Sequence, residues 1–202
     1  VKLHHNDLPE GVKFEGAVAI DSETMGLNPK RDRLCVVQLS DGSGDAHLVK
    51  FDGADYRAPR LRALLEDASV LKIFHFARFD VAVFMEWLEV ETASIYCTKI
   101  ASKLSRTYTD RHGLKDVVRE IVGVELSKQQ QSSDWGAAEL SDAQKDYAAS
   151  DVLYLHQVKA GLDAMLERQG RTELAKACFD FLPCRARLDL AGWNDQDIFA
   201  HS

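Results

Sequence analysis

Five side chains of this 202-residue chain combine acidity with positions beside apolar segments. They are Asp21 and Glu23 in AVAIDSET, Asp80 after IFHFARF, and Tyr147 and Asp151 in YAASD. A carboxylate in such a place is costly unless a cation compensates it. Two divalent ions would carry four positive charges against the four carboxylates, and oxygen ligands suit Mg²⁺ and Mn²⁺. Because two such ions about 4 Å apart are a common device for cleaving phosphodiesters, the pattern favours metal-dependent nuclease chemistry.

Each element of this pattern also has a plainer interpretation. Asp21 and Glu23 would share one face of a strand and need a cation between them, unless the strand ends at Ile20 and DSET is a polar turn. Asp80 would lie in the first turn of a helix, where its charge could simply complement the helix dipole.

The tyrosine and the last acid are four residues apart on a predicted helix and therefore share a face. Tyr154, Val158 and Leu162, followed by Met165, continue roughly that stripe, which favours an inward-facing side. There the Tyr147 hydroxyl could hydrogen-bond a water. Alternatively, the tyrosine ring belongs to the core and Asp151 caps a loop.

The elements that must position these residues change along the chain. Residues 17–23, 34–40 and 46–51 read as strands separated by turn signals, which predicts an antiparallel meander. A helix over 57–67, a strand over 70–75, a helix over 78–88 and a strand over 92–97 then alternate, as in parallel crossovers. Ser141 and Gln144 form a capping-box pattern at the start of a long helix to about Arg168, and a last helix spans roughly 171–189. The sequence therefore predicts the α/β class.

Bulk composition sets limits on the molecule. With 46% apolar and 28% charged residues, we expect one domain over 1–202. No apolar run is long enough for a membrane span, and the first residues lack the apolar region of a signal peptide. The four cysteines form no CxxC pair, which favours free thiols and a cytoplasmic location.

Charge bears on the partners. A net charge of −7 argues against coating long nucleic acid, but a metal neutralises the acids of its own site. One basic cluster could bind a short substrate or be a solvated helix face; it comprises Lys99, Lys103, Arg106, Arg111, Lys115 and Arg119.

Taken together, the motifs resemble the DEDDy branch of the DEDD 3′–5′ exonucleases, and within it the ribonuclease D group. DSETMGL, HFARFD and YAASD resemble its three motifs in order, over about residues 15–170. Residues 113–155 are similar to ribonuclease D throughout, including Lys128, Gln131 and Ser133-Asp134-Trp135. The resemblance implies a ribonuclease H-like mixed sheet flanked by helices.

The resemblance also implies roles for the site residues. Asp21, Glu23 and Asp151 would hold the divalent ion that activates the attacking water, and Asp21 and Asp80 the one that stabilises the leaving 3′-oxygen. Tyr147 would orient the water. The substrate contacts would come from Glu23 at the 3′-hydroxyl, Leu27 against the terminal base, and Thr24, His75 and Phe76. In-line attack on the last phosphodiester would release a nucleoside 5′-monophosphate.

One position departs from the pattern, because many relatives have Asn where this chain has Phe76. We interpret Phe76 as a packing or stacking residue near the site. His75 could face the site or belong to the core or to a helix cap.

The C-terminal part resembles the short, single-domain nano-RNase C type of alpha-proteobacteria, including the ending GWNDQDIF. That type acts on very short oligonucleotides and forms ring-like octamers, so we expect residues 171–202 to serve oligomerisation. Trp193, Ile198 and Phe199 fit an interface, although the tail could instead fold back on its own domain.

Three functions follow as hypotheses. The first is a two-metal 3′–5′ exoribonuclease acting on short oligoribonucleotides, especially dinucleotides. The second is ribonuclease D-like processing of longer or structured RNA 3′ ends, and the third is a nucleic-acid-binding module without catalysis. The choice between RNA and DNA ends, and between Mg²⁺ and Mn²⁺, is left open.

Overall fold

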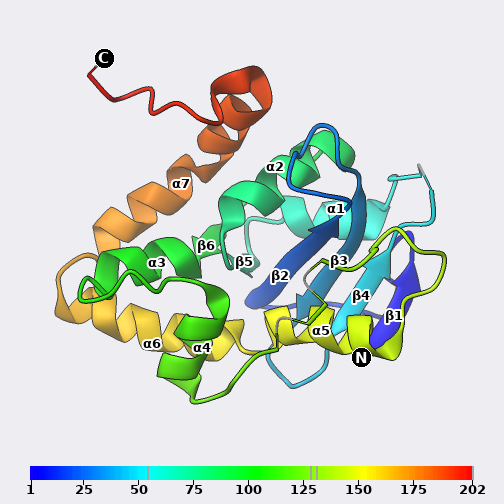
Figure 1. The fold of residues 1–202 in the computed structure, drawn as a ribbon, viewed down its shortest axis with the longest axis horizontal. Helices are drawn as coiled ribbons and strands as arrows, with labels where there is room; N and C mark the ends of the chain where they lie inside the picture. The colour runs from blue at the N-terminus through cyan, green and yellow to red at the C-terminus, as the bar shows by residue number, and fades with distance from the viewer. Residues whose placement is uncertain (54, 128, 131, 202) are drawn as a thin grey trace.

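The computed structural model describes residues 1–53, 55–127, 129–130 and 132–201, and its centre is a six-stranded mixed sheet (Figure 1). The strands are β1 (Lys2–His5), β2 (Ala17–Thr24), β3 (Leu34–Ser40), β4 (His47–Lys50), β5 (Leu71–Phe74) and β6 (Ile95–Cys97). They lie side by side in the order β1-β4-β3-β2-β5-β6. β3 is antiparallel to β2 and β4, whereas β5 is parallel to β2 and β6. The predicted meander and parallel crossovers are therefore confirmed.

Seven α-helices of the described chain flank this sheet. They are α1 (Pro59–Glu66), α2 (Ala77–Trp87), α3 (Thr98–Ser105), α4 (Leu114–Val122), α5 (Asp142–Leu153), α6 (Leu155–Arg168) and α7 (Thr172–Leu188), followed by the π-helical turn η1 (Asp189–Trp193). α5 packs across β2, β3 and β4, and α6 continues along β5, as Figure 1 shows. α2 packs on β5, β6 and α7. The predicted α/β class is confirmed.

The predicted long helix from Ser141 is wrong in one respect, because it breaks at Tyr154. The capping box at its start is present: the Ser141 Oγ accepts from the Gln144 amide at 3.2 Å, and the Gln144 Oε1 accepts from the Ser141 amide at 3.0 Å. Tyr154, at φ −104° and ψ −4°, then separates α5 from α6. The break lets α5 follow the meander strands and α6 follow β5 as the sheet twists.

The basic cluster divides into structural and accessible members. Arg106 is only 1% exposed; its Nη1 donates to Ser102 Oγ at 2.9 Å and to the Arg111 carbonyl at 2.7 Å, and its guanidinium pairs with Glu120. It joins α3 to α4 and is no part of a basic surface. Arg119 pairs with Asp116 at 2.8 Å.

Two further predictions concern the cysteines and membrane-spanning helices. Cys35, Cys97, Cys178 and Cys184 are free thiols. Within the described ranges, no helix combines the length and the apolar character needed to cross a bilayer.

Candidate active site

Strand β2 carries the first two acids of the site. It extends to Thr24, so the alternative of a polar turn after Ile20 is wrong. Asp21 and Glu23 therefore project from the same face of β2. The pairing with β3 shifts register between Glu23 and Thr24. Such bulges re-aim side chains at the end of a strand.

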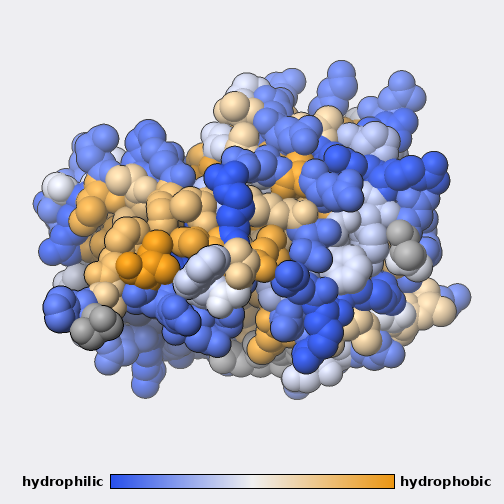
Figure 2. Space-filling view, turned by 90° about the horizontal axis from the view of Figure 1, so that it is seen from above, coloured by the Kyte–Doolittle hydropathy of each residue, from blue (hydrophilic) through white to orange (hydrophobic). Residues whose placement is uncertain are grey.

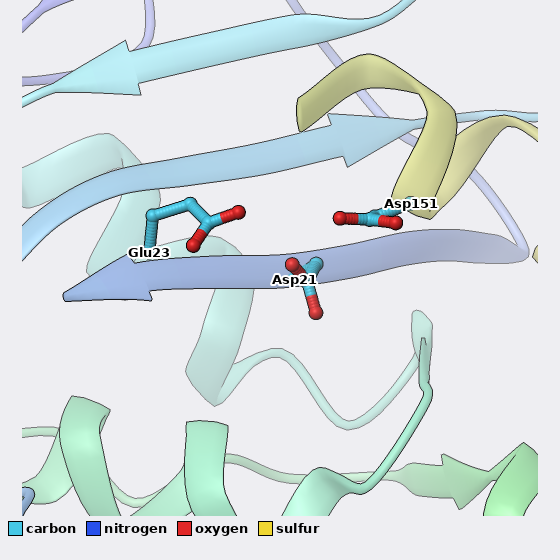
Figure 3. A group of neighbouring side chains, drawn as sticks. All are labelled: Asp21, Glu23 and Asp151. Carbon is cyan, nitrogen blue, oxygen red and sulfur yellow. The ribbon is translucent and has the colours of Figure 1, made fainter. Parts of the chain in front are cut away.

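Helix α5 brings the third carboxylate to this face. Oxygen atoms of Asp21, Glu23 and Asp151 all lie within 4.8 Å of one another. Figure 3 shows the three side chains pointing toward one another from β2 and α5. Asp151 therefore points from α5 toward the two acids on β2. Like charges this close repel unless protons or a cation lie among them.

The pKa values of these acids reflect the crowding. Burial raises the pKa of Asp21 to about 7. Burial, with the charges of Asp21, Asp151 and Asp80, raises the pKa of Glu23 to about 10. Burial and the charge of Asp21 also raise the pKa of Asp151. None of these three acids forms an ion pair with a described Lys, Arg or His. The group is an acidic site whose oxygen donors fit a hard divalent cation.

The fourth acid comes from the first turn of α2, as predicted. Asp80 is 3% exposed, and its Oδ1 accepts a hydrogen bond from Ser22 Oγ at 2.6 Å. Burial and the charge of Asp21 raise the pKa of Asp80 well above its usual range. Its carboxylate is linked to β2 through Ser22 and is not one of the three that lie within 4.8 Å. Ser22 was not predicted as a site residue, because its only signal in the sequence is its place between two acids.

Tyr147 lies one turn before Asp151 on α5, and its ring packs 6.1 Å from the Trp135 ring between centroids. It is half-buried and lines the same pocket as the acids. Burial, with the charge of Asp151, raises the pKa of its phenol, which is therefore protonated at neutral pH. The residue combines the two alternatives, a packed ring and a hydroxyl at the site.

Asp21, Glu23 and Asp151 line a pocket of about 690 Å³, whereas Asp80 is not among its lining residues. Its other walls include Thr24, Leu27, His75, Lys99 and Lys115. Leu27 is 88% exposed.

His75 is held from within the protein. Its Nδ1 lies 2.8 Å from Thr98 Oγ1, and burial together with Lys99 lowers the pKa of His75 to about 3. It is therefore a neutral pocket wall.

The turn after β2 presents Leu27. A Cβ on Gly26 would come 2.3 Å from Asp32 Oδ2, so only glycine fits there without a shift. The same Asp32 oxygen accepts from the Asn28 amide at 2.9 Å, and Trp87 Nε1 donates to the Pro29 carbonyl at 2.8 Å. These bonds fix a tight turn with Leu27 at its tip.

Phe76 does not line this pocket but two neighbouring hollows. It is the N-cap of α2 at φ 70° and ψ 44°, a left-handed conformation that asparagine adopts more readily than phenylalanine. Lys99 Nζ lies 4.3 Å from the centre of its ring. The departure from the family pattern thus falls at a position with a special backbone conformation.

Two residues of the resemblance, Lys128 and Gln131, lie outside the described residues. Ser133 and Trp135 of the same segment line the pocket. Gln38 was not predicted either; it is a lone amide in the apolar run LCVVQLS, and it contacts two of the acids.

The comparisons agree with this geometry. A family model described as 3′–5′ exonuclease matches residues 5–167. Ribonuclease D of Acidiphilium cryptum is 33% identical over 159 residues, which are 79% of this chain and 40% of that protein. Ribonuclease D of Escherichia coli is 32% identical over 166 residues, 81% of this chain and 43% of that protein. The chain thus spans about two fifths of the length of these curated relatives.

Solved structures cover the whole chain. Brucella melitensis NrnC matches with a TM-score of 0.96 and 58% identity over 100% of this chain and 98% of that chain. The structure of the same protein with bound Mg²⁺ matches with a TM-score of 0.94 and 56% identity. Its structure bound to pGG matches with a TM-score of 0.95 and 57% identity, and both matches have the same coverage. The fold, the motifs and these matches all indicate the same family. This chain therefore belongs to the DEDD 3′–5′ exonucleases, within their ribonuclease D-like group, and it is similar to NrnC over its full length.

Proposed function

We propose that this chain is a divalent-metal-dependent 3′–5′ exoribonuclease that degrades very short oligoribonucleotides, dinucleotides above all, to nucleoside 5′-monophosphates. The observation that carries the proposal is the group of three carboxylates within 4.8 Å at the wall of an open pocket. The similarity of the full chain to NrnC, a protein whose structure was solved with bound pGG, supports the substrate class.

Pocket size favours a short substrate. About 690 Å³ lies within the range of roughly 300–1,000 Å³ that suits one drug-sized ligand. A dinucleotide is of that size. Lys99 and Lys115 line the pocket and supply positive charge for phosphate oxygens.

The metal assignment follows from the acids. Asp21, Glu23 and Asp151 would hold one divalent ion, and Asp21 with Asp80 a second. When bound, the two ions supply Lewis-acid activation of a water and stabilisation of the leaving 3′-oxygen. Mg²⁺ or Mn²⁺ fits this all-oxygen donor set.

The remaining residues bind and orient. Tyr147 keeps its proton at neutral pH and can hold the attacking water through its hydroxyl. Leu27, exposed at the tip of its turn, can lie against the terminal base, with Thr24 and the neutral His75 beside it. Glu23 can accept from the terminal 3′-hydroxyl. Phe76 would contribute from the neighbouring hollow.

A time course on pGG, a 7-mer and a 20-mer RNA, with Mg²⁺ and with Mn²⁺, tests the proposal. We expect the dinucleotide to be turned over fastest, EDTA to stop the reaction, and Asp151→Asn to be inactive. Faster trimming of the 20-mer would favour ribonuclease D-like processing instead. Binding without turnover would indicate a binding module, and a matching DNA series reports on sugar specificity.

We also propose that the chain self-associates through α7 and the tail that follows it. Figure 2 views the molecule from above and shows apolar side chains gathered over its left half, the side on which Figure 1 places α7. The exposed large apolar side chains of α7, η1 and the tail are Leu174, Phe181, Trp193, Ile198 and Phe199. Arg78 fixes the start of the tail through Asp189 at 2.6 Å, and Phe199 packs 6.0 Å from Phe181 between ring centroids while staying 77% exposed.

Light scattering tests the assembly. We expect a homo-oligomer, an octamer by the resemblance, and a shift to smaller species for Phe199→Ser. A monomeric wild-type protein would contradict the proposal without affecting the nuclease assignment.

A further inference from the structure

Gln38 is a polar residue in a strand that is otherwise committed to the core. Every residue of β3 is buried, and Gln38 is 0% exposed. In the pairing of β3 with β2, Gln38 lies directly opposite Asp21. An amide in this position must find hydrogen-bond partners or destabilise the strand.

The partners that it finds are two of the candidate metal ligands. Gln38 Nε2 lies 3.4 Å from Asp21 Oδ2 and 3.5 Å from Glu23 Oε1. The opposite orientation of the amide would place its carbonyl oxygen against both carboxylates, where two acceptors would repel. The contacts are long, so they contribute less to folding than short bonds would.

The other end of the amide supports the same interpretation. Gln38 Oε1 is buried and has no hydrogen-bond partner among the residues that the structure describes. A residue kept for folding alone would be better replaced by an apolar one of the same size. The contacts of Gln38 therefore indicate that it serves the two carboxylates and not the packing of the core.

We propose that Gln38 is a positioning residue, whose amide holds the Asp21 and Glu23 carboxylates at a fixed separation so that both can ligate the same divalent ion. This rests on the proposed function. Without the amide dipole between them, the two anions on one face of β2 would turn apart. Residues that orient metal ligands in this way are typically worth 10–100-fold in affinity or activity, on the order of what we expect here.

The experiment compares Gln38→Met, which keeps the volume and loses the donor, with Ser40→Ala on the same strand. Ser40 is buried, its hydroxyl donates to the Asp45 carbonyl at 2.7 Å, and it does not line the pocket. The measurements are Mn²⁺ affinity by calorimetry, kcat on pGG, and Tm in EDTA.

We expect Gln38→Met to bind Mn²⁺ and to turn over pGG about 10–100-fold less well, with Tm unchanged or raised. We expect the reverse for Ser40→Ala, which should lose Tm and keep both affinity and kcat. If Gln38→Met does not fold, Gln38→Asn decides with the same readouts, since it keeps an amide that is too short to reach both acids.

Wild-type affinity and kcat in a Gln38 variant would overturn the positioning role and leave the nuclease assignment intact. A wild-type protein that neither binds Mn²⁺ nor cleaves pGG would overturn the proposed function, and the positioning role with it.

Discussion

Two regions of this molecule withdraw charge from water and compensate it in opposite ways. At the corner of α3 and α4, the buried Arg106 is matched by Glu120, a hydroxyl and a carbonyl. At the junction of β2 and α5, three carboxylates face one another, and the neutral amide of Gln38 contacts two of them. The first region satisfies its charge internally, whereas the second leaves it for something that binds.

This difference separates structural from functional charge. An internally paired ion contributes to the fold, and removing one partner leaves the other unsatisfied. A group of like charges costs folding energy and is maintained for the ligand that it attracts. Substitutions in the two regions should therefore have opposite effects on stability and activity.

The largest effect is expected from Asp21→Asn. Loss of a carboxylate from the group should lower kcat on a dinucleotide by on the order of 10²–10³-fold. Tm in EDTA should hold or rise, because one repelling charge is gone. Asp45→Asn, which changes an exposed acid paired with Lys2, is the matched control and should leave kcat unchanged. An active Asp21→Asn enzyme would remove the distinction between the regions.

Arg106→Met should do the opposite. Glu120 is partly exposed and can regain water, so we expect a loss of about 2 kcal/mol in the free energy of unfolding, below the roughly 3–5 kcal/mol of a fully buried pair. The activity per folded molecule should stay close to wild type. Urea unfolding measures the free energy of unfolding, and kcat corrected for the folded fraction measures the activity per folded molecule. A loss of kcat without a loss of stability would contradict the structural assignment.

The secondary structure could be predicted from the sequence for some elements and not for others. β3 was predicted with its observed limits, 34–40, because a strand buried on both faces leaves a continuous apolar run. β1 was missed because KLHH is short, polar and at the sheet edge. The break at Tyr154 has no glycine or proline to mark it; it arises from packing on a twisted sheet.

The site divides in the same way. The acids could be identified from three short motifs, on β2, α2 and α5, because the spacing within each motif is local. Arg106 was grouped with surface lysines because spacing does not reveal which basic residue turns inward. Ser22 and Gln38 act through partners 58 and 17 positions away, and such contacts exist only once the chain has folded.

Stability against pH gives a smaller effect with a definite sign. Burial raises the pKa of Asp21 from 3.8 to about 7 and that of Glu23 from 4.5 to about 10. The folded protein then binds these protons more tightly than the unfolded chain, so the stability they contribute is complete below about pH 4. It is lost as pH rises, up to about pH 7 for Asp21 and up to about pH 10 for Glu23. Between pH 5 and 8 in EDTA, Tm should therefore fall steadily, by roughly 2–4 °C for each kcal/mol of stability that is lost.

Saturating Mn²⁺ should flatten that slope, because the ion replaces the protons. Thermal melts at four pH values, with EDTA and with Mn²⁺, measure both slopes. Parallel slopes in the two series would mean that the protons and the ion do not compete for the same carboxylates.

The smallest effect concerns the accessible part of the basic segment. Lys115 lines the pocket and, unlike Arg106, is half-buried with its ammonium available to an anion. Lys115→Ala should raise KM for a dinucleotide a few-fold, about 1 kcal/mol or less as for an exposed ion pair, and should leave kcat unchanged. Steady-state kinetics at low and high salt measure it. A KM that is the same at both salt concentrations in wild type and variant would exclude a phosphate contact.

The most direct test of the central claim is calorimetric titration of metal-free protein with Mn²⁺ at pH 7, in two buffers of different ionisation enthalpy. If the acidic group binds the ion, the observed heat will depend on the buffer, because carboxyls with raised pKa values release protons to it. Asp21→Asn should bind more weakly and release fewer protons. Absence of binding, or binding with no proton release in either buffer, would contradict a metal site at Asp21, Glu23 and Asp151.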